Sequence, residues 1–183
     1  MELGMNPTNS SGDEILRTER LVVCKLTDQD AAFILELLNE PAFLRFIGDR
    51  GVRNIENAHA YLENGPFNSY KVNGFGLWRV DLIQGREPVG MCGLLKRDGL
   101  QDIDIGYAYL ARHWSKGYAS EAAQAVRDYA FEVLGVNRLV AITDPLNVGS
   151  MHVLEKIGMK FDHKLRLSPN SEEVNLFVIG EKS

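Results

Sequence analysis

The sequence predicts an α/β (α+β) fold in which a mixed, mostly antiparallel sheet carries helices on both faces. Three strand-like runs in the middle of the chain are separated by short polar turns, and turns of that length join antiparallel strands. A long amphipathic segment follows them and lies ahead of another strand-like run. Helical crossovers of that kind join parallel strands, so we expect both pairing modes in one sheet.

The length of the chain predicts a single domain. At 183 residues, with 45% hydrophobic and 25% charged residues, it can bury one sizeable core and has little room for a second. Residues 1–13 are polar, which predicts a flexible N-terminal tail ahead of a domain over residues 14–183. No run approaches the roughly 20 apolar residues of a membrane span, and the polar start does not resemble a signal peptide. We therefore expect a cytoplasmic protein without a membrane partner.

Folding is expected to start near Ile15, with a first strand over Arg20–Lys25. Thr27 and Asp30 form a capping-type start to a helix with an apolar stripe, and Pro41 is expected to end that helix. The chain between this helix and the next gives no clear signal.

A second helix is expected over Asn54–Asn64, capped by Asn54 and closed by Gly65-Pro66. The later elements follow from the spacing of apolar residues and from the turns between them. In order they are strands 77–83, 88–96 and 101–110, helix 119–134, strand 138–143, helix 147–157 and strand 173–179. Helix 119–134 is the clearest, because its apolar residues keep helical spacing and stop at Gly135.

Charge and residue spacing exclude several functional classes. The formal net charge is −5 and the basic residues are scattered, so no nucleic-acid partner is expected. Cys24 and Cys92 lie singly in apolar runs and are expected to be buried, reduced thiols. The histidines are His59, His113, His152 and His163, and they show no metal-ligand spacing, so no metal site is expected. A nucleotide-hydrolysing phosphate loop is absent from the sequence.

The turn ahead of helix 119–134 is a candidate anion site. The first turn of a helix leaves backbone N–H groups free, and the helix dipole favours negative charge there. Gly117 lets the backbone approach a phosphate closely, and Lys116 adds a positive charge. An ordinary loop whose glycine only shapes a turn explains the same residues equally well.

The run Trp114-Ser115-Lys116-Gly117-Tyr118-Ala119 and the Ser120-Glu121-Ala122 after it resemble the cofactor signature of the GNAT acetyltransferase superfamily, closest to its RimJ/RimL type. Trp114 stands where the superfamily pattern has Gln or Arg, a departure common in that type. Further segments are similar to the same family in the same order, namely Asp104-Ile105-Gly106-Tyr107, Asn147, Ser150 and Glu155-Lys156-Ile157-Gly158-Met159. The resemblance covers roughly residues 18–179.

The resemblance implies a single GNAT-like domain with a splayed sheet and acetyl-CoA as cosubstrate. It implies that backbone amides across 114–119 hold the pyrophosphate. The pantetheine arm would hydrogen-bond an exposed strand edge, with Tyr109 as its backbone partner and Asn147 also reaching it. The segment Pro41–Tyr70 would border the acceptor.

N-acetyl transfer needs a neutral amine, a proton acceptor and a donor for the departing thiolate. Strand alternation places Asp104 on one face among small neighbours, where we expect it to look outward. The resemblance puts the family's usual catalytic glutamate at Asp104, and this shorter side chain would act directly or through a water. A solvated surface carboxylate is the alternative for Asp104, and Asp102 carries the same ambiguity.

Many superfamily members place a tyrosine acid in the helix expected here over 147–157, but the matching residue is Leu154. Ser150 falls on the packed stripe of that helix, where the resemblance places the cofactor sulfur. Ser150 is the candidate acid or hydrogen-bond donor to the thiolate. A first-turn serine that satisfies free backbone donors is the alternative, and Asn147 is expected to start the helix.

These residues predict an N-acetyltransferase that works by direct transfer in a ternary complex. A modest base suits an α-amine, whose pKa of about 7.7 to 8 leaves it partly neutral, better than lysine at about 10.4. We therefore expect a protein or peptide N-terminus, or a small amine of low pKa, as acceptor. Neither cysteine has a paired histidine in the sequence pattern, so no covalent relay is expected.

Two alternatives stay open. The acceptor could be an antibiotic, a polyamine or an amino acid, and the acidic balance slightly favours a cationic acceptor. The chain could also be a sensor that binds acyl-CoA without turnover, since the usual tyrosine is missing. An exposed strand edge would also allow two copies of the chain to pair as a homodimer.

Overall fold

The computed structural model describes residues 12–181, which form an eight-stranded sheet with the order β1-β2-β3-β4-β5-β6-β8-β7. The strands are β1 Glu14–Arg17, β2 Leu21–Lys25, β3 Leu77–Leu82, β4 Pro88–Leu95, β5 Ile103–Tyr109, β6 Arg138–Thr143, β7 Lys160–Arg166 and β8 Glu173–Gly180. Only β5 and β6 pair in parallel, and the other neighbours are antiparallel. The predicted mixed, mostly antiparallel sheet is thus confirmed. Most of the tail expected over 1–13 lies outside the described residues.

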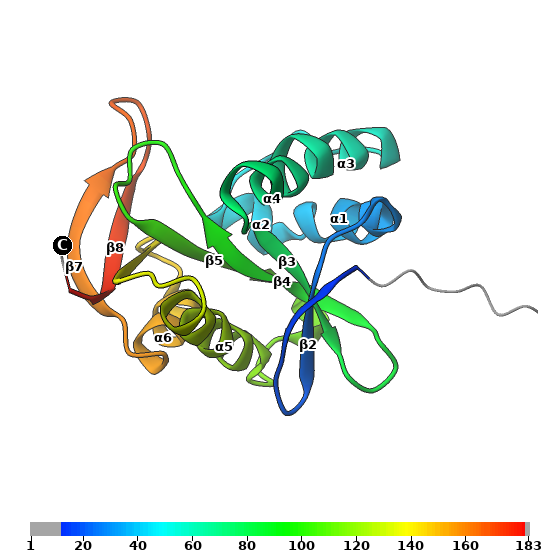
Figure 1. Cartoon of the computed structure of the whole chain (residues 1–183). Helices are drawn as coiled ribbons and strands as arrows, with labels where there is room; N and C mark the ends of the chain where they lie inside the picture. The colour runs from blue at the N-terminus through cyan, green and yellow to red at the C-terminus, as the bar shows by residue number, and fades with distance from the viewer. Residues whose placement is uncertain (1–11, 182–183) are drawn as a thin grey trace, which may run out of the picture.

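Helices cover both faces of the sheet (Figure 1). They are α1 Ala31–Leu38, α2 Pro41–Phe46, α3 Ile55–Leu62, α4 Asn68–Asn73, α5 Tyr118–Glu132 and α6 Val148–Lys156, with short turns at Asp28–Asp30, Glu63–Phe67 and Ala111–His113. Helices α1 to α4 lie on one face and α5 and α6 on the other. No helix among residues 12–181 is long and apolar enough to span a membrane.

Each face of the sheet has its own hydrophobic core. Successive residues of β5 point to opposite faces, so Ala108 packs against the core under α1 to α4 while Tyr107 packs against the core under α5. The stripe of α5 that meets the sheet is small and fully buried, with Ala122, Ala123 and Val126 at 0% exposure. Small side chains bring α5 close to the sheet, which sets the position of its N-terminus beside the end of β5.

Two predicted helix ends are wrong. Pro41 does not end a helix but is the first residue of α2, where a missing N–H removes no hydrogen bond. Gly65-Pro66 does not close the second helix either, because the chain continues through a π turn over Glu63–Phe67 into α4. The wider turn accommodates the buried Pro66 inside the run, and the helix ends at Gly74 with φ 76°.

Two strands were not predicted. Strand β1 extends the sheet ahead of β2, and β7 lies at the opposite edge, beyond β8. Most side chains of β7 are exposed and several are charged, which is typical of an edge strand and hides the usual alternation. The remaining predicted elements appear close to their expected bounds, and β6 matches at both ends.

Candidate active site

The site is built on a gap between β5 and β6. The two strands pair only at Ile103 with Leu139 and at Asp104 with Val140, and β5 continues without a partner on that side. This is the splay that the family resemblance implied.

One hydrogen bond shows which backbone N–H and C=O groups of β5 point into the gap. The Leu110 N–H donates to the Val89 carbonyl of β4 at 3.0 Å, and the backbone groups of successive residues in a strand point to opposite edges. The peptide groups of Ile105, Tyr107 and Tyr109 therefore face the gap. An extended ligand can hydrogen-bond a strand edge of this kind.

Trp114 closes the far end of this edge. Its indole N–H donates to the Tyr109 carbonyl at 2.8 Å, while 49% of the residue stays exposed. The Trp114 backbone N–H is already used by Ala111, at 3.1 Å, so it is not a free donor at the anion site expected over 114–119.

The backbone N–H groups of residues 115–120 donate to no other group between residues 12 and 181. They cluster where the chain turns into α5, because Ser115 and Gly117 have φ of 61° and 82° and reverse the chain tightly. Helix α5 runs for 15 residues, so its dipole adds to these free donors. This turn fits a phosphate group by its geometry and by its charge.

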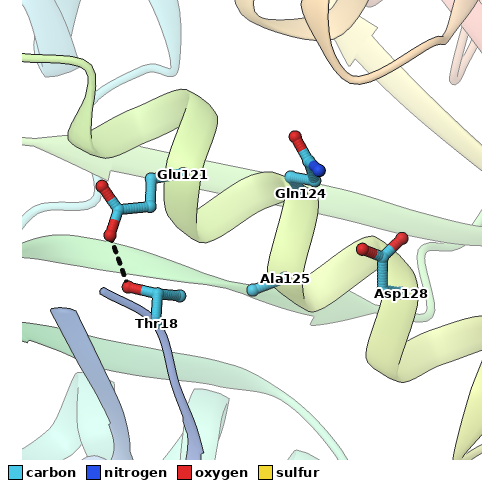
Figure 2. Close-up of a pocket in the computed structure, with 5 residues that line it drawn as sticks. All are labelled: Thr18, Glu121, Gln124, Ala125 and Asp128. Atoms are coloured by element: carbon cyan, nitrogen blue, oxygen red, sulfur yellow. Dashed lines mark hydrogen bonds between the residues drawn. The ribbon is translucent and has the colours of Figure 1, made fainter. Parts of the chain in front are cut away.

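Arg20, which the sequence did not single out, clamps this turn. Its guanidinium donates to the Lys116 carbonyl at 2.9 Å and to Glu121 at 2.7 Å, and it lies 4.8 Å from the ring centroid of Tyr118. Figure 2 shows Thr18 hydrogen-bonded to Glu121 on α5, at 2.6 Å. Burial favours the neutral form of Glu121, but these hydrogen bonds outweigh it and lower its pKa. The β1–β2 turn is thereby tied to the N-terminus of α5.

Asp104 is buried at 1% exposure, so the expectation of an outward-looking or solvated carboxylate is wrong. The Arg97 guanidinium forms an ion pair with Asp104 Oδ2. It lies on the same face of β5 as Asp104 and Gly106, because a Cβ added to Gly106 would be 3.8 Å from it. Oδ1 has no hydrogen-bond partner in the described chain. Burial raises the pKa of Asp104 to about 6, against the opposing charge and hydrogen bond of Arg97 and the opposing effect of the nearby Ile142 backbone N–H.

Ser150 meets a tyrosine that the sequence did not lead us to expect. The Tyr107 hydroxyl of β5 lies 3.0 Å from Ser150 Oγ and 3.0 Å from the Ser150 carbonyl. Asn147 caps α6 as predicted, since its side-chain oxygen accepts the Ser150 N–H at 3.1 Å. Burial raises the pKa of Tyr107, so its hydroxyl stays protonated at neutral pH. The matching helical residue, Leu154, is buried in the core.

Asp104 and the hydroxyl pair lie on opposite faces of β5, because Asp104 and Tyr107 are an odd number of positions apart along the strand. Both flank the stretch where β6 has separated from β5. A bond placed in the gap would have a proton acceptor on the face of α1 to α4 and hydrogen-bond donors on the face of α5 and α6. That arrangement suits acyl transfer between two substrates that enter from opposite faces.

Other candidate residues have structural partners. Asp102 pairs with Arg138 at 3.1 Å, and His113 is buried with its Nε2 3.0 Å from Glu87. Cys24 and Cys92 are buried and unpaired, as predicted. Over residues 12–181, no group of three or more His, Cys, Asp or Glu side chains is placed to hold a metal ion.

Comparisons with known proteins agree with this geometry. Residues 20–160 match the family model of the acetyltransferase (GNAT) domain. The chain is 31% identical over 154 residues to the uncharacterized protein YkkB of Bacillus subtilis (strain 168), covering 82% of this chain and 88% of that protein. It is 29% identical over 153 residues to the uncharacterized N-acetyltransferase YoaA of the same organism, covering 83% and 86%.

Solved structures share the whole fold. An acetyltransferase from Agrobacterium tumefaciens str. C58 has a TM-score of 0.75 at 28% identity, covering 97% of this chain and 100% of that one. RimL, a ribosomal alpha-N-protein acetyltransferase in complex with coenzyme A, has a TM-score of 0.78 at 14% identity, covering 92% and 98%. The match to the family model over most of the chain, together with this fold, shows that the chain belongs to the GNAT acetyltransferase family.

Proposed function

We propose that this chain is an N-acetyltransferase that moves the acetyl group of acetyl-CoA directly to a primary amine, with a protein N-terminal α-amine as the favoured acceptor. The gap between β5 and β6 is the observation that carries the proposal. A buried carboxylate flanks it on one face of the sheet and a hydroxyl pair flanks it on the other. Such a site can take a proton from an amine and stabilise a leaving thiolate at one bond.

The same gap supports a place for acetyl-CoA, which supplies the thioester carbonyl. The backbone N–H of Tyr109, whose carbonyl is used by Trp114, would hydrogen-bond the pantetheine arm, and the amide nitrogen of Asn147 would reach the arm from the start of α6. The pyrophosphate would lie on the turn Trp114–Ala119, held by the free N–H groups from Ser115 onward. Arg20 holds that turn in shape and leaves these N–H groups free.

In the proposed mechanism, Asp104 takes the proton that the amine loses as its nitrogen bonds to the acetyl carbon, directly or through one water. Ser150 Oγ donates a hydrogen bond to the sulfur as the carbon–sulfur bond breaks. Tyr107 holds Ser150 Oγ in place, which replaces the tyrosine absent from α6. The thiolate leaves stabilised by this hydrogen bond and takes its proton from solvent after release. The buried Cys92, whose pKa is raised by burial, has no part in the transfer.

An α-amine fits this base best, because an α-amino pKa of about 7.7 to 8 leaves part of the acceptor neutral near pH 7. The likeness in fold to RimL, a ribosomal alpha-N-protein acetyltransferase, supports the RimJ/RimL type and this acceptor class. An antibiotic, a polyamine or an amino acid is the alternative acceptor.

The test is acceptor-dependent release of coenzyme A from acetyl-CoA, followed with a thiol reagent, for wild type and Asp104→Asn. N-terminal peptides, polyamines, amino acids and aminoglycosides form the acceptor panel. We expect release with α-amine peptides that falls about a hundredfold or more in the variant. Equal turnover on free lysine side chains would defeat the α-amine assignment. Tight acetyl-CoA binding without release for any acceptor would favour an acyl-CoA sensor.

A further inference from the structure

The position of Asp104 indicates the side from which the acceptor arrives, if the proposed function holds. Its carboxylate lies on the face of the sheet covered by α1 to α4, together with Ala108. The amine must reach this carboxylate, so the rest of the acceptor has to lie among the elements on that face. The segment between α2 and α4 is part of this cover.

A cavity of about 430 Å³ opens in this cover, between the loop after α2 and one side of α3. Its polar lining comes from Arg50, Asn57, Tyr61 and Asn64. Tyr61 lines the cavity and also packs against the core of this face. Burial raises the pKa of Tyr61, and the positive charges of Arg50 and Arg97 oppose that effect. Arg97 is the partner of Asp104.

The charge on this lining is positive. Arg50 forms no ion pair with any carboxylate of residues 12–181, and no acidic residue lines the cavity. Asp49 is next to Arg50 in sequence, but it pairs with Arg53 and accepts the Gly51 N–H at 2.8 Å.

Two acidic residues lie next to lining residues in the sequence but do not line the cavity themselves. They are Glu56 on α3 and Glu63 in the π turn that follows α3. Glu63 also pairs with Lys71 at 3.1 Å.

The neutral groups of the lining are donors as well. Asn57 Oδ1 accepts the Arg53 N–H at 3.2 Å, so its amide nitrogen is the group left for a ligand. The side chain of Asn64 has no hydrogen bond within residues 12–181, and its amide can turn its nitrogen to the cavity. A guanidinium flanked by amide donors is a complement for a carboxylate or a phosphate oxygen, and it repels an ammonium group.

We propose that this cavity, centred on Arg50, binds an anionic group of the acceptor, so that the preferred substrate is an amine that also carries a carboxylate, such as a peptide with an acidic residue close behind its N-terminus. This selectivity is opposite to the one that the net charge of −5 favours. It rests on the local charge around the cavity and not on the sum over the chain.

The experiment compares peptides that begin with alanine and carry Glu, Gln or Lys at the second, third or fourth position, with spermidine as a cationic acceptor. Each is assayed by coenzyme A release with wild type, Arg50→Gln and Arg50→Glu. Arg45→Gln is the matched control, because Arg45 lies on α2, stacks on Phe46 and does not line the cavity. It removes the same charge from the same part of the chain.

We expect wild type to prefer Glu over Gln by about tenfold in kcat/KM at one or more positions, through KM. Arg50→Gln should abolish that preference, Arg50→Glu should turn it toward Lys, and Arg45→Gln should keep it. Equal use of the three peptides by wild type, a preference for Lys or spermidine, or a Glu preference that survives Arg50→Gln would overturn the proposal.

A binding measurement separates failure of this inference from failure of the proposed function. The Ala-Glu-Glu peptide is titrated into the ¹⁵N-labelled chain in the presence of coenzyme A, and the amide signals of Gly51 and Asn64 are followed. Shifts in wild type that vanish in Arg50→Gln support the anion site even if no acceptor is acetylated. The absence of shifts at these amides would overturn it whatever the assay shows.

Discussion

The carboxylate of Asp104 is nearly inaccessible to water, and a buried charge costs free energy unless its neighbours compensate it. Arg97 binds one oxygen, while Oδ1 has no hydrogen-bond partner among residues 12–181. A carboxylate held in this way binds protons more tightly than one in water, and a proton acceptor with a pKa near neutrality suits amine chemistry. The same features that favour catalysis at Asp104 are therefore expected to reduce stability.

The first prediction concerns activity against pH. Because the pKa of Asp104 is raised to about 6, kcat/KM should rise as pH increases through about 6, where the carboxylate loses its proton. The profile is measured with an α-amine peptide and corrected for ionisation of the peptide itself. A corrected profile that is flat between pH 5 and 7 would exclude Asp104 as the base.

The second prediction concerns stability against pH. The folded pKa of about 6 lies above the usual value of 3.8, so the stabilising contribution of Asp104 is present below pH 3.8 and is lost as pH rises through about 6. Asp104→Asn removes this pH-dependent loss of stability. Arg97 has no partner in the variant, but its side chain is 29% exposed, so water can solvate its charge. The variant should exceed wild type in free energy of unfolding at pH 8 by on the order of 1–3 kcal/mol, with little difference at pH 4.

Urea unfolding of both proteins at the two pH values measures this difference. A variant less stable than wild type at pH 8 would mean that the ion pair with Arg97 outweighs the cost of burial.

The third prediction tests the hydroxyl pair. Tyr107→Phe and Ser150→Ala should each lower kcat, and the double variant should lose little more than the worse single variant, because both remove one hydrogen-bonded unit. Tyr129→Phe, which removes a hydroxyl from α5 away from the gap, is the control. Losses that multiply in the double variant would show that Tyr107 and Ser150 act independently.

At the scale of residues, short sequence motifs predicted the candidate site residues that belong to one local segment of the chain. Asp104, Ser150 and the turn before α5 came from such motifs, and the structure places them around one gap. Tyr107 and Arg20 were missed as site residues because their partners are distant in the sequence. Tyr107 contacts a residue 43 positions away, and Arg20 contacts residues 96 and 101 positions away. Only the sheet order brings those segments together. The burial of Asp104 was also missed, because strand alternation predicts which face of the sheet a side chain lies on but not which elements cover that face.

At the scale of elements, the β1–β2 turn and the N-terminus of α5 form one unit. Thr18 hydrogen-bonds Glu121 (Figure 2). The backbone and side chain of Arg20 also bind Glu121, and the Arg20 guanidinium reaches the Lys116 carbonyl as well. A helix N-terminus binds an anion best when its first turn is held rigid, because less order has to be imposed on binding. Arg20 also neutralises Glu121, whose charge would otherwise repel a phosphate.

The fourth prediction follows from this unit. Arg20→Gln should raise KM for acetyl-CoA by about tenfold, with kcat changed less, because the turn that receives the pyrophosphate loses its clamp. Arg17→Gln is the matched control, since Arg17 lies on β1 and pairs with Glu14 alone among residues 12–181. Steady-state kinetics at saturating acceptor measure both constants. A loss confined to kcat would place the role of Arg20 in the chemical step instead.

Helices and strands were predicted correctly where a single pattern of apolar side chains determines their structure. The buried stripe of α5 and the alternation in β6 are of that kind. Strand β7 has no such pattern, because only β8 holds it and its side chains face water. Pro66 was taken as a breaker because a regular α-helix excludes proline, whereas the π turn around it changes the hydrogen-bonding and lets the helix continue.

At the scale of the whole molecule, the sheet separates two hydrophobic cores and two approaches to one gap. Helices α1 to α4 cover the face of Asp104, and α5 and α6 cover the face of Tyr107 and Ser150 (Figure 1). An acceptor and acetyl-CoA that enter from opposite faces meet only where β5 and β6 have parted. This arrangement supports the proposed direct transfer within a ternary complex, and both cysteines are buried.

The most direct test of this account is the fate of an isotopically labelled acetyl group. The chain is mixed with acetyl-labelled acetyl-CoA, with and without an α-amine peptide, and label is measured by mass spectrometry on the peptide and on the intact chain. The account predicts label on the peptide amine only when wild-type chain and peptide are both present, and none held covalently by the chain. Label on Cys24 or Cys92, or a bound acetyl-CoA that passes its label to no amine, would contradict it.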